Sequence, residues 1–357
     1  MLKFPLSFFT KIAESLRIIK FLSIKRSMFI CVAVLNIVPY LLFVMLSIEL
    51  AVIAFIFGVG FLYKGSDILV EGTSKTAAHL GVSSLIISVI VVAFGTSAPE
   101  FAISVGAAVQ SYADISVGNI VGSCIANLLL IIGLSAVIRP LNIQRGIIKR
   151  EMPIVAIATA IFLLFSYAAL LDGYHYIGGI FFLVFFVAFI FYFIKCAQKE
   201  RKQNFNLVAK DNLVKNITYI SLGIVGVVAG AWLLIESALA FAELFGIPEI
   251  VISLSMVAIG TSLPELVVSA VASYKKESDI AVGNVLGSNV FNILLILGIC
   301  ALFIPLNVAQ SMDHIIILTI ITFVMFPIVL SGKKISRIEG VFLLALYSIY
   351  ICYLFFF

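Results

Sequence analysis

Two short segments of the chain place a carboxylate and a hydroxyl where together they could hold a cation. The segments read Ala-Phe-Gly-Thr-Ser-Ala-Pro-Glu at residues 93–100 and Ala-Ile-Gly-Thr-Ser-Leu-Pro-Glu at residues 258–265. In a helix, the threonine and the glutamate of each segment lie four residues apart on one face. The proline has no N–H, so it kinks the helix and frees a backbone carbonyl. Each segment therefore predicts a kinked helix that presents hydroxyl, carboxylate and carbonyl oxygens.

A second motif adds amides and further hydroxyls. Gly-Asn-x-x-Gly-Ser occurs at residues 118–123 and 283–288, and four residues after its serine stands Asn127 in the first case and Asn292 in the second. With the two glutamates, these residues offer the oxygen ligands that Ca2+ prefers, whereas no histidine or cysteine pair has the spacing of a zinc or copper site. Two glutamates also carry a charge of −2, which balances one Ca2+. The residue types thus predict a site for a hard divalent cation.

Both motifs belong to a long internal repeat. Every matched position is separated by the same 165 residues, from Glu71 and Glu236 near one end to Pro140 and Pro305 near the other. No insertion interrupts the match. The chain therefore contains two copies of one unit, and matched residues are expected to occupy equivalent places in the fold.

The elements that carry the motifs must be membrane helices. With 63% hydrophobic and 11% charged residues, the composition excludes a soluble globular domain. Apolar runs that can cross a hydrocarbon layer of about 30 Å recur along the chain. A carboxylate in such a layer is costly unless it meets protein, water or a cation, so Glu100 and Glu265 are functional candidates. The predicted spans lie near residues 29–45, 47–74, 84–109, 115–138, 152–171, 175–194, 216–242, 250–273, 280–303, 313–330 and 338–356.

The basic residues predict the topology, because cytoplasmic loops carry an excess of lysine and arginine. Of the 23 basic residues, six lie in the N-terminal arm of residues 1–26, so this arm is expected inside and residues 29–45 must cross as an extra helix. We therefore expect eleven spans, or ten if translation begins at Met45. Sixteen others lie in alternate loops, at residues 75, 139–150, 195–215, 275–276 and 333–337.

Each copy holds five predicted spans, an odd number, so the second copy enters the membrane from the opposite side. The predicted fold is an all-α integral membrane protein with an inverted repeat of 5+5 transmembrane helices and an extra N-terminal helix. In such folds a ligand site forms near the middle of the membrane, where the copies meet. The predicted parts are the N-terminal arm and helix at 1–45, the first repeat at 46–195, a cytoplasmic linker at 196–215 and the second repeat at 216–357.

Other matched residues have simpler explanations than ligand binding. The glycines of the second motif are explained equally well by close helix packing and by a role at the cation site. Glu71 and Glu236 lie near the ends of long spans, where solvation of a helix end explains them better than ligation. Asp114 and Asp279 lie at helix starts, where N-capping is the ordinary explanation.

The two motif pairs resemble those of a known family, the Ca2+/cation antiporters, and within it the prokaryotic Na+/Ca2+ exchangers. The resemblance covers residues 46–357 and implies a cluster of cation sites between the two repeats. It implies that Ca2+ is bound by Glu100, Glu265, Thr96 and Thr261. It implies that Na+ is bound by the same glutamates with the Ala93 and Ala258 carbonyls and with Ser97, Ser123, Asn127, Ser262, Ser288 and Asn292.

The function that the resemblance implies is secondary active exchange of Ca2+ for Na+ by alternating access, with no cofactor. Some family members carry Asp where this chain has Asn292, which leaves the coupling stoichiometry and any K+ dependence open. A Ca2+/H+ antiporter is an alternative, because a glutamate can also carry a proton. A passive cation channel is a more distant one, because paired buried acids and an inverted repeat suit occlusion better than conduction.

The sequence also bears on location and partners. No nucleophile–base pair or cofactor motif suggests an enzyme. We expect a multi-pass protein of the cell membrane, the cytoplasmic or inner membrane of a prokaryote, with the basic loops and the linker in the cytoplasm. The lipid bilayer and the two ions are the expected partners. Neither nucleic acid nor an obligate protein partner is expected, since the net charge of +5 is concentrated at the inner face.

Overall fold

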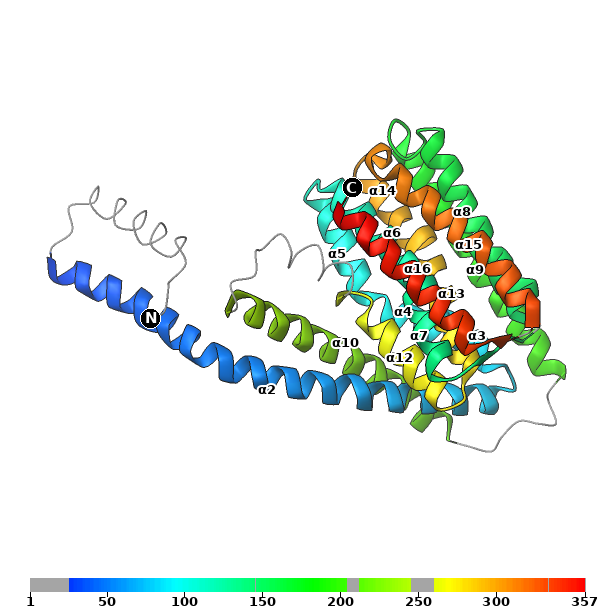
Figure 1. The fold of residues 1–357 in the computed structure, drawn as a ribbon, viewed down its shortest axis with the longest axis horizontal. Helices are drawn as coiled ribbons and strands as arrows, with labels where there is room; N and C mark the ends of the chain where they lie inside the picture. The colour runs from blue at the N-terminus through cyan, green and yellow to red at the C-terminus, as the bar shows by residue number, and fades with distance from the viewer. Residues whose placement is uncertain (1–25, 145, 204–211, 245–259, 333, 357) are drawn as a thin grey trace. The chain divides into compact units, whose positions relative to one another are not determined.

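The regular structure of this chain is almost entirely helical (Figure 1). The computed structural model describes residues 26–144, 146–203, 212–244, 260–332 and 334–356. They divide into two compact units, Met1–Ile53 and Ala54–Phe357. Both sequence motifs lie in the second unit.

The helices follow the order of the repeat. The first copy and its flanks contain α2 (Arg26–Leu80), α3 (Ser84–Ile87), η1 (Ser88–Val92), α4 (Ala93–Thr96), α5 (Ala98–Val109), α6 (Ala113–Ala126), η2 (Asn127–Ile131), α7 (Ile132–Ile138), η3 (Ile147–Glu151), α8 (Met152–Tyr167) and α9 (His175–Gln203). The second contains α10 (Leu213–Leu244), α12 (Leu263–Tyr274), α13 (Ser278–Val290), η5 (Phe291–Ile296), α14 (Leu297–Phe303), η6 (Val308–Ser311), α15 (Met312–Gly332) and α16 (Arg337–Phe356). Strands β1 (Leu141–Asn142) and β2 (Lys334–Ile335) pair antiparallel, with Leu141 opposite Ile335.

Seven helices of the described residues are long and apolar enough to cross a membrane, and eight if the bent pair Ser84–Thr96 and Ala98–Val109 forms one span. The predicted break near residue 46 is absent, because α2 continues through it and the local sequence holds no glycine or proline that would end a helix. Of the predicted span 250–273, residues 250–259 lie outside the described residues.

The repeat is visible in matching turns. The hairpin between α5 and α6 contains Ser111 with a φ of 65°, and the hairpin between α12 and α13 contains Lys276, its repeat mate, with a φ of 72°. A left-handed conformation is uncommon for residues other than glycine, so its occurrence at both matched positions shows that the two turns share one geometry. The capping prediction for Asp114 and Asp279 is wrong: each lies within the first turn of its helix, where its charge favours the helix dipole.

Two long helical segments form the centre of the second unit. Residues Ala113–Ile138 and Ser278–Phe303 have 78% and 83% of their most apolar stretch buried, against 28% for Glu49–Leu80 and 22% for Leu213–Phe241. Helix α13 packs against α3, η1 and α4 of the other copy. This close packing depends on the absence of a side chain at Gly287, where an added Cβ would lie 2.6 Å from the Val89 carbonyl oxygen.

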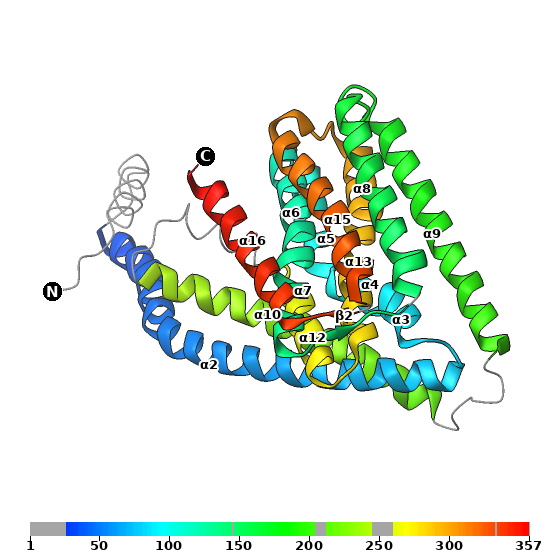
Figure 2. The same ribbon diagram turned by 45° about the vertical axis from the view of Figure 1, so that its right-hand side comes forward.

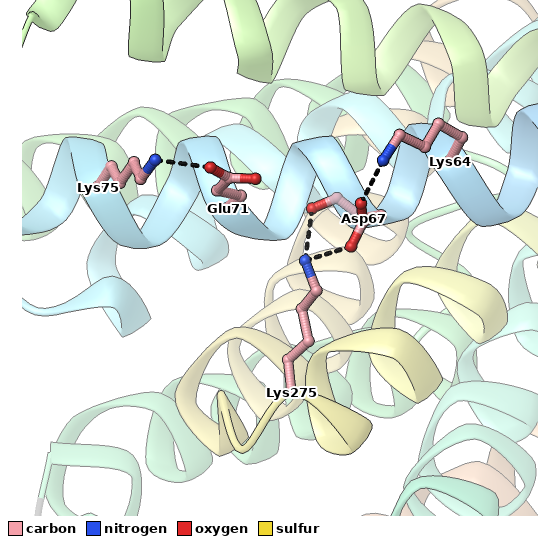
Figure 3. A network of polar contacts seen from close by, with 5 residues as sticks. All are labelled: Lys64, Asp67, Glu71, Lys75 and Lys275. Carbon is pink, nitrogen blue, oxygen red and sulfur yellow. Dashed lines mark hydrogen bonds and ion pairs between the residues drawn. The ribbon is translucent and has the colours of Figure 1, made fainter.

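An ion pair connects the part of α2 in the second unit to the end of α12 (Figure 3). Lys275, at the end of α12, forms an ion pair with the Asp67 carboxylate and donates to the Asp67 carbonyl at 3.0 Å. Lys64 approaches the same carboxylate at 2.8 Å. These are contacts near the surface, so they fix the position of one helix end and contribute little to overall stability.

The packing at Gly287 leads to a stability prediction. Gly287→Ala should destabilise the protein by about 1–3 kcal/mol, because a backbone oxygen cannot move aside for the new methyl group. Gly106→Ala is the matched control, since a Cβ there meets no described atom. Thermal unfolding in detergent, followed by the loss of monodisperse protein, would measure both. Equal midpoints for the two variants would contradict the packing argument.

Candidate cation site

Both motif glutamates lie at the start of a helix, and for Glu100 that helix follows a break. The chain bends by 49° between Ser84–Thr96 and Ala98–Val109, and Ser97 sits at the bend with a φ of −78° and a ψ of 10°. Ser262, its repeat mate, has nearly the same conformation, with φ of −85° and ψ of 6°. A proline follows in the first turn of each new helix, as the sequence predicted. Glu100 and Glu265 thus lie in the first turns of α5 and α12, where the helix dipole favours a negative charge.

The two carboxylates are fully buried and are held by serines in a crossed pattern. The Glu100 Oε1 atom accepts from Ser123 of its own copy and from Ser262 of the other copy, both at 3.1 Å. The Glu265 Oε1 atom accepts from Ser288 of its own copy at 3.3 Å and from Ser97 of the other copy at 2.9 Å. The same four relations hold after exchange of the copies, so the side chains obey the twofold symmetry of the repeat.

The second oxygen of each carboxylate has no donor. Glu100 Oε2 and Glu265 Oε2 are buried without a hydrogen-bond partner among the described residues. None of the ion pairs in that part of the chain involves either glutamate. Burying an acceptor without a donor, or a charge without a partner, is unfavourable, so an arrangement of this kind favours a bound cation or a proton.

The amide oxygens of Asn127 and Asn292 are unpaired in the same way. Both side chains are fully buried, and their Oδ1 atoms have no partner among the described residues. Asn127 begins the π-helical turn η2, and Asn292 lies in the matching π-helical turn η5. Such turns interrupt regular packing and often occur at functional sites. The donor-free oxygens are therefore two carboxylate and two amide oxygens, related in pairs by the repeat.

Each motif threonine is linked to an asparagine of the opposite copy. Thr96 Oγ1 donates to Asn284 Oδ1 at 3.0 Å, and Thr261 Oγ1 donates to Asn119 Oδ1 at 3.3 Å. Because a hydroxyl has one hydrogen and also carries lone pairs, a threonine that donates to an asparagine can still accept or bind a cation through its oxygen. The asparagines are positioned in turn by Ser104 and Ser269, to which their Nδ2 atoms donate.

Most of the predicted site residues meet in this cluster. None of the following is more than 3% exposed: Thr96, Ser97, Glu100, Ser123, Asn127, Thr261, Ser262, Glu265, Ser288 and Asn292. The Ala93 carbonyl accepts the Ser97 N–H at 3.0 Å and lies 3.3 Å from Thr96 Oγ1, so protein donors already surround it. Ala258 lies outside the described residues.

The matched acids outside the motifs lie away from the cluster. Glu71 pairs with Lys75 at 2.6 Å on α2 (Figure 3), and Glu236 is exposed on α10. The described residues contain no group of three or more His, Cys, Asp or Glu side chains that could hold a metal ion. A cation at this site would therefore be coordinated by two carboxylates with hydroxyl and amide oxygens, a set that suits hard cations.

Sequence reasoning missed several buried polar residues of the site. Ser104 and Ser269 match at the repeat offset of 165, and that signal could have identified them. Asn289 is also buried in the cluster, but its repeat mate is Cys124, so the symmetry argument could not have found it.

Comparisons with known proteins place the chain among membrane transporters. A sequence profile of the family described as sodium/calcium exchanger protein matches residues 50–195 and 215–356. The sodium/calcium exchanger MaX1 of Methanosarcina acetivorans is 34% identical over 338 residues, which cover 84% of this chain and 97% of that protein. The inner membrane protein YrbG of Escherichia coli is 32% identical over 284 residues, covering 76% and 86%.

Solved structures give the same result. The sodium-calcium exchanger NCX_Mj, in crystals soaked with Na+ and Ca2+, superposes with a TM-score of 0.73 at 33% identity and covers 85% of this chain and 98% of its own. The family match extends over both repeats, and the predicted fold class of an all-α membrane protein with an inverted repeat is confirmed. In place of a separate helix at residues 29–45, α2 runs without a break from Arg26 to Leu80. The chain belongs to the sodium/calcium exchanger family.

Proposed function

We propose that this protein is a secondary active transporter that exchanges Ca2+ for Na+ across a membrane by alternating access. The observation that carries the proposal is the pair of fully buried carboxylates, one from each repeat, whose Oε2 atoms have no donor in the described residues. The proposed activity is transport and not catalysis of a chemical reaction. The family is a family of transporters.

Ca2+ is bound by both glutamates and by the two motif threonines. The carboxylates supply a charge of −2 that balances one Ca2+, and each threonine hydroxyl is held in place by an asparagine of the opposite copy. Na+ uses the same carboxylates, which makes the two ions competitors. The remaining ligands proposed for Na+ are the Ala93 and Ala258 carbonyls, Ser97, Ser123, Asn127, Ser262, Ser288 and Asn292.

Because residue 292 is an asparagine, the proposed cation site contains only two acidic side chains, Glu100 and Glu265. Its amide and that of Asn127 are equivalent by the repeat, so neither copy contributes a further charge there. Two carboxylates are sufficient for one Ca2+, and the exchange proposal does not require a third.

The moving element of the proposed cycle is α10 with the part of α2 that belongs to the second unit, Ala54–Leu80, and these two segments lie side by side in both views (Figures 1 and 2). Their backbones approach closely through glycines: an added Cβ on Gly65 would lie 2.8 Å from the Val227 nitrogen, and one on Gly230 would lie 2.6 Å from the Leu62 nitrogen. Gly65 and Gly230 are repeat mates. This pair is well suited to slide as one body over the more buried central helices.

The sliding pair contacts the cation cluster directly. The Ile224 side chain of α10 fills the space beside Gly95, one residue before Thr96, where an added Cβ would lie 2.5 Å from Ile224 Cδ1. Movement of α10 therefore uncovers or covers the cluster. Exchange is enforced because unneutralised glutamates are too costly to carry through the occluded state.

We also propose the orientation and location predicted from sequence. The basic loops and the linker of residues 196–215 face the cytoplasm, and the protein spans the cytoplasmic membrane of a prokaryotic cell. In this arrangement the chain consists of an N-terminal segment at residues 1–45, the first repeat at 46–195 and, after the linker, the second repeat at 216–357. Ca2+, Na+ and the bilayer lipids are the proposed partners.

The direct test is a flux measurement with single ion gradients. In liposomes containing the purified protein, an outward Na+ gradient should drive 45Ca2+ uptake, whereas a K+ gradient or a pH gradient alone should not, because Na+ is the ion proposed to compete for the glutamates. Uptake driven by a pH gradient without Na+ would identify a Ca2+/H+ antiporter instead. Single-channel currents in planar bilayers would identify a channel.

Removal of either buried charge should abolish exchange. Glu100→Gln and Glu265→Gln keep the side-chain shape and an acceptor for the serines, but they halve the charge that balances Ca2+, so Na+-driven 45Ca2+ uptake should fall to background. Gel filtration should show folded protein in both cases. Glu236→Gln, on exposed α10, is the matched control and should retain uptake. Normal uptake by either site variant would overturn the assignment.

The threonine hydroxyls should be needed for Ca2+ affinity. Thr96→Val removes one oxygen ligand at nearly constant volume and should raise the Ca2+ concentration for half-maximal uptake by roughly tenfold, equivalent to about 1.4 kcal/mol. Thr96→Ser keeps the hydroxyl and should remain close to the unmodified protein. An unchanged Ca2+ dependence in the valine variant would exclude Thr96 from the Ca2+ ligands.

A further inference from the structure

One buried position next to the cation cluster differs between the repeats in its hydrogen-bonding group. Asn289 of α13 corresponds to Cys124 of α6 at the offset of 165 residues. They are 1% and 0% exposed, and each lies three residues before the central asparagine of its copy, Asn292 and Asn127. An amide replaces a thiol here, although the neighbouring residues of the site match.

The Asn289 amide makes two hydrogen bonds to the opposite copy. Its Oδ1 atom accepts from Asn127 Nδ2 at 2.8 Å, and its Nδ2 atom donates to the Cys124 carbonyl at 3.3 Å. The second bond fixes the amide of Asn289 with its oxygen toward Asn127. Asn127 must then present its nitrogen to Asn289, and this leaves the Asn127 Oδ1 atom buried without a donor in the described residues.

The opposite central amide is held differently. Asn292 Nδ2 donates to Ser123 Oγ at 3.1 Å, and Ser123 is itself hydrogen-bonded to the Glu100 carboxylate. The orientation of Asn292 therefore depends on a hydroxyl that is itself a proposed Na+ ligand. The orientation of Asn127 depends on a residue outside the ligand set. Cys124 makes the equivalent contact with Asn292, but a thiol is a weak hydrogen-bonding group, so it orients that amide less firmly than the Asn289 amide orients Asn127.

We propose that Asn289 is a positioning residue for exchange: it holds the Asn127 amide with its oxygen free for Na+, and it makes the two halves of the site unequal. The inference rests on the proposed function. Ser123 and Asn127 are four residues apart on one helix face, so the fixed oxygen lies one turn from the serine that contacts Glu100. If the Asn127 amide were rotated, its oxygen would face the Asn289 oxygen. Both atoms are acceptors, so the hydrogen bond between the two side chains would be lost.

The test is a double-mutant cycle in liposomes, with Na+-dependent 45Ca2+ release as the measurement. Asn289→Leu keeps the volume and removes both bonds, and it should raise the Na+ concentration for half-maximal release about tenfold while leaving the half-maximal Ca2+ concentration within twofold. Asn127→Ala should have a similar effect on Na+. The double variant should show no further change, because Asn289 is proposed to act only through Asn127.

Val290→Ala is the matched control: it removes buried volume from the same helix, one residue further on, and should not alter the Na+ dependence. If Asn289→Leu fails to fold, Asn289→Ala enters the same cycle, with Na+ displacement of bound 45Ca2+ from detergent-solubilised protein as a second readout. Additive effects in the double variant, or a Na+ dependence of the Asn289 variants equal to that of the unmodified protein, would overturn the inference. Absence of Na+-coupled flux in the unmodified protein would instead overturn the proposed function.

Discussion

A pair of carboxylates buried among apolar helices, with no basic side chain paired to them in the described residues, is the constraint on which this structure depends. Charged groups in such surroundings are strongly unfavourable when they lack a counterion. The serines satisfy only one oxygen of each carboxylate, and helix dipoles at the starts of α5 and α12 stabilise the charges further without neutralising them. The negative charge that remains makes the site favourable for bound cations and unfavourable when no cation is bound.

The crossed hydrogen bonds make each half of the site depend on the other half. Ser97 of the first copy contacts the glutamate of the second, and Ser262 does the reverse. The threonine to asparagine bonds cross between the copies in the same manner. Each repeat alone therefore supplies only one of the two serine donors to its own carboxylate, and the relative position of the two copies becomes part of the binding chemistry.

Rigid and movable parts are separated by how deeply their helices are buried. The segments Ala113–Ile138 and Ser278–Phe303 carry the asparagines of the site together with Ser123 and Ser288, and most of their apolar surface is covered by protein. In contrast, α10 and the later part of α2 are largely exposed to the surroundings, and glycines join them to each other. Tight packing within this pair and modest packing against the centre are compatible with movement of the pair as a body.

The sequence by itself determined the membrane class, the repeat and the kink of the first motif helix, because composition, the constant offset of 165 and the proline positions are local properties of the chain. With the family resemblance, it also predicted ten residues that the structure buries in one cluster. It could not anticipate the continuity of α2 through residue 46 or the first-turn places of Asp114 and Asp279. Helix boundaries depend on a few small free energies that neighbouring elements can outweigh.

Only the tertiary structure decided which hydroxyl serves which carboxylate. Contacts such as Ser97 to Glu265 join residues 168 positions apart, and no periodicity in the chain encodes them. The same holds for Asn289, whose role depends on the Asn127 amide and the Cys124 carbonyl of the other copy. A repeat in sequence identifies what is equivalent in the two halves. The asymmetry between Asn289 and Cys124 acquires meaning only when the halves are packed together, because hydrogen bonds depend on distance and direction in space.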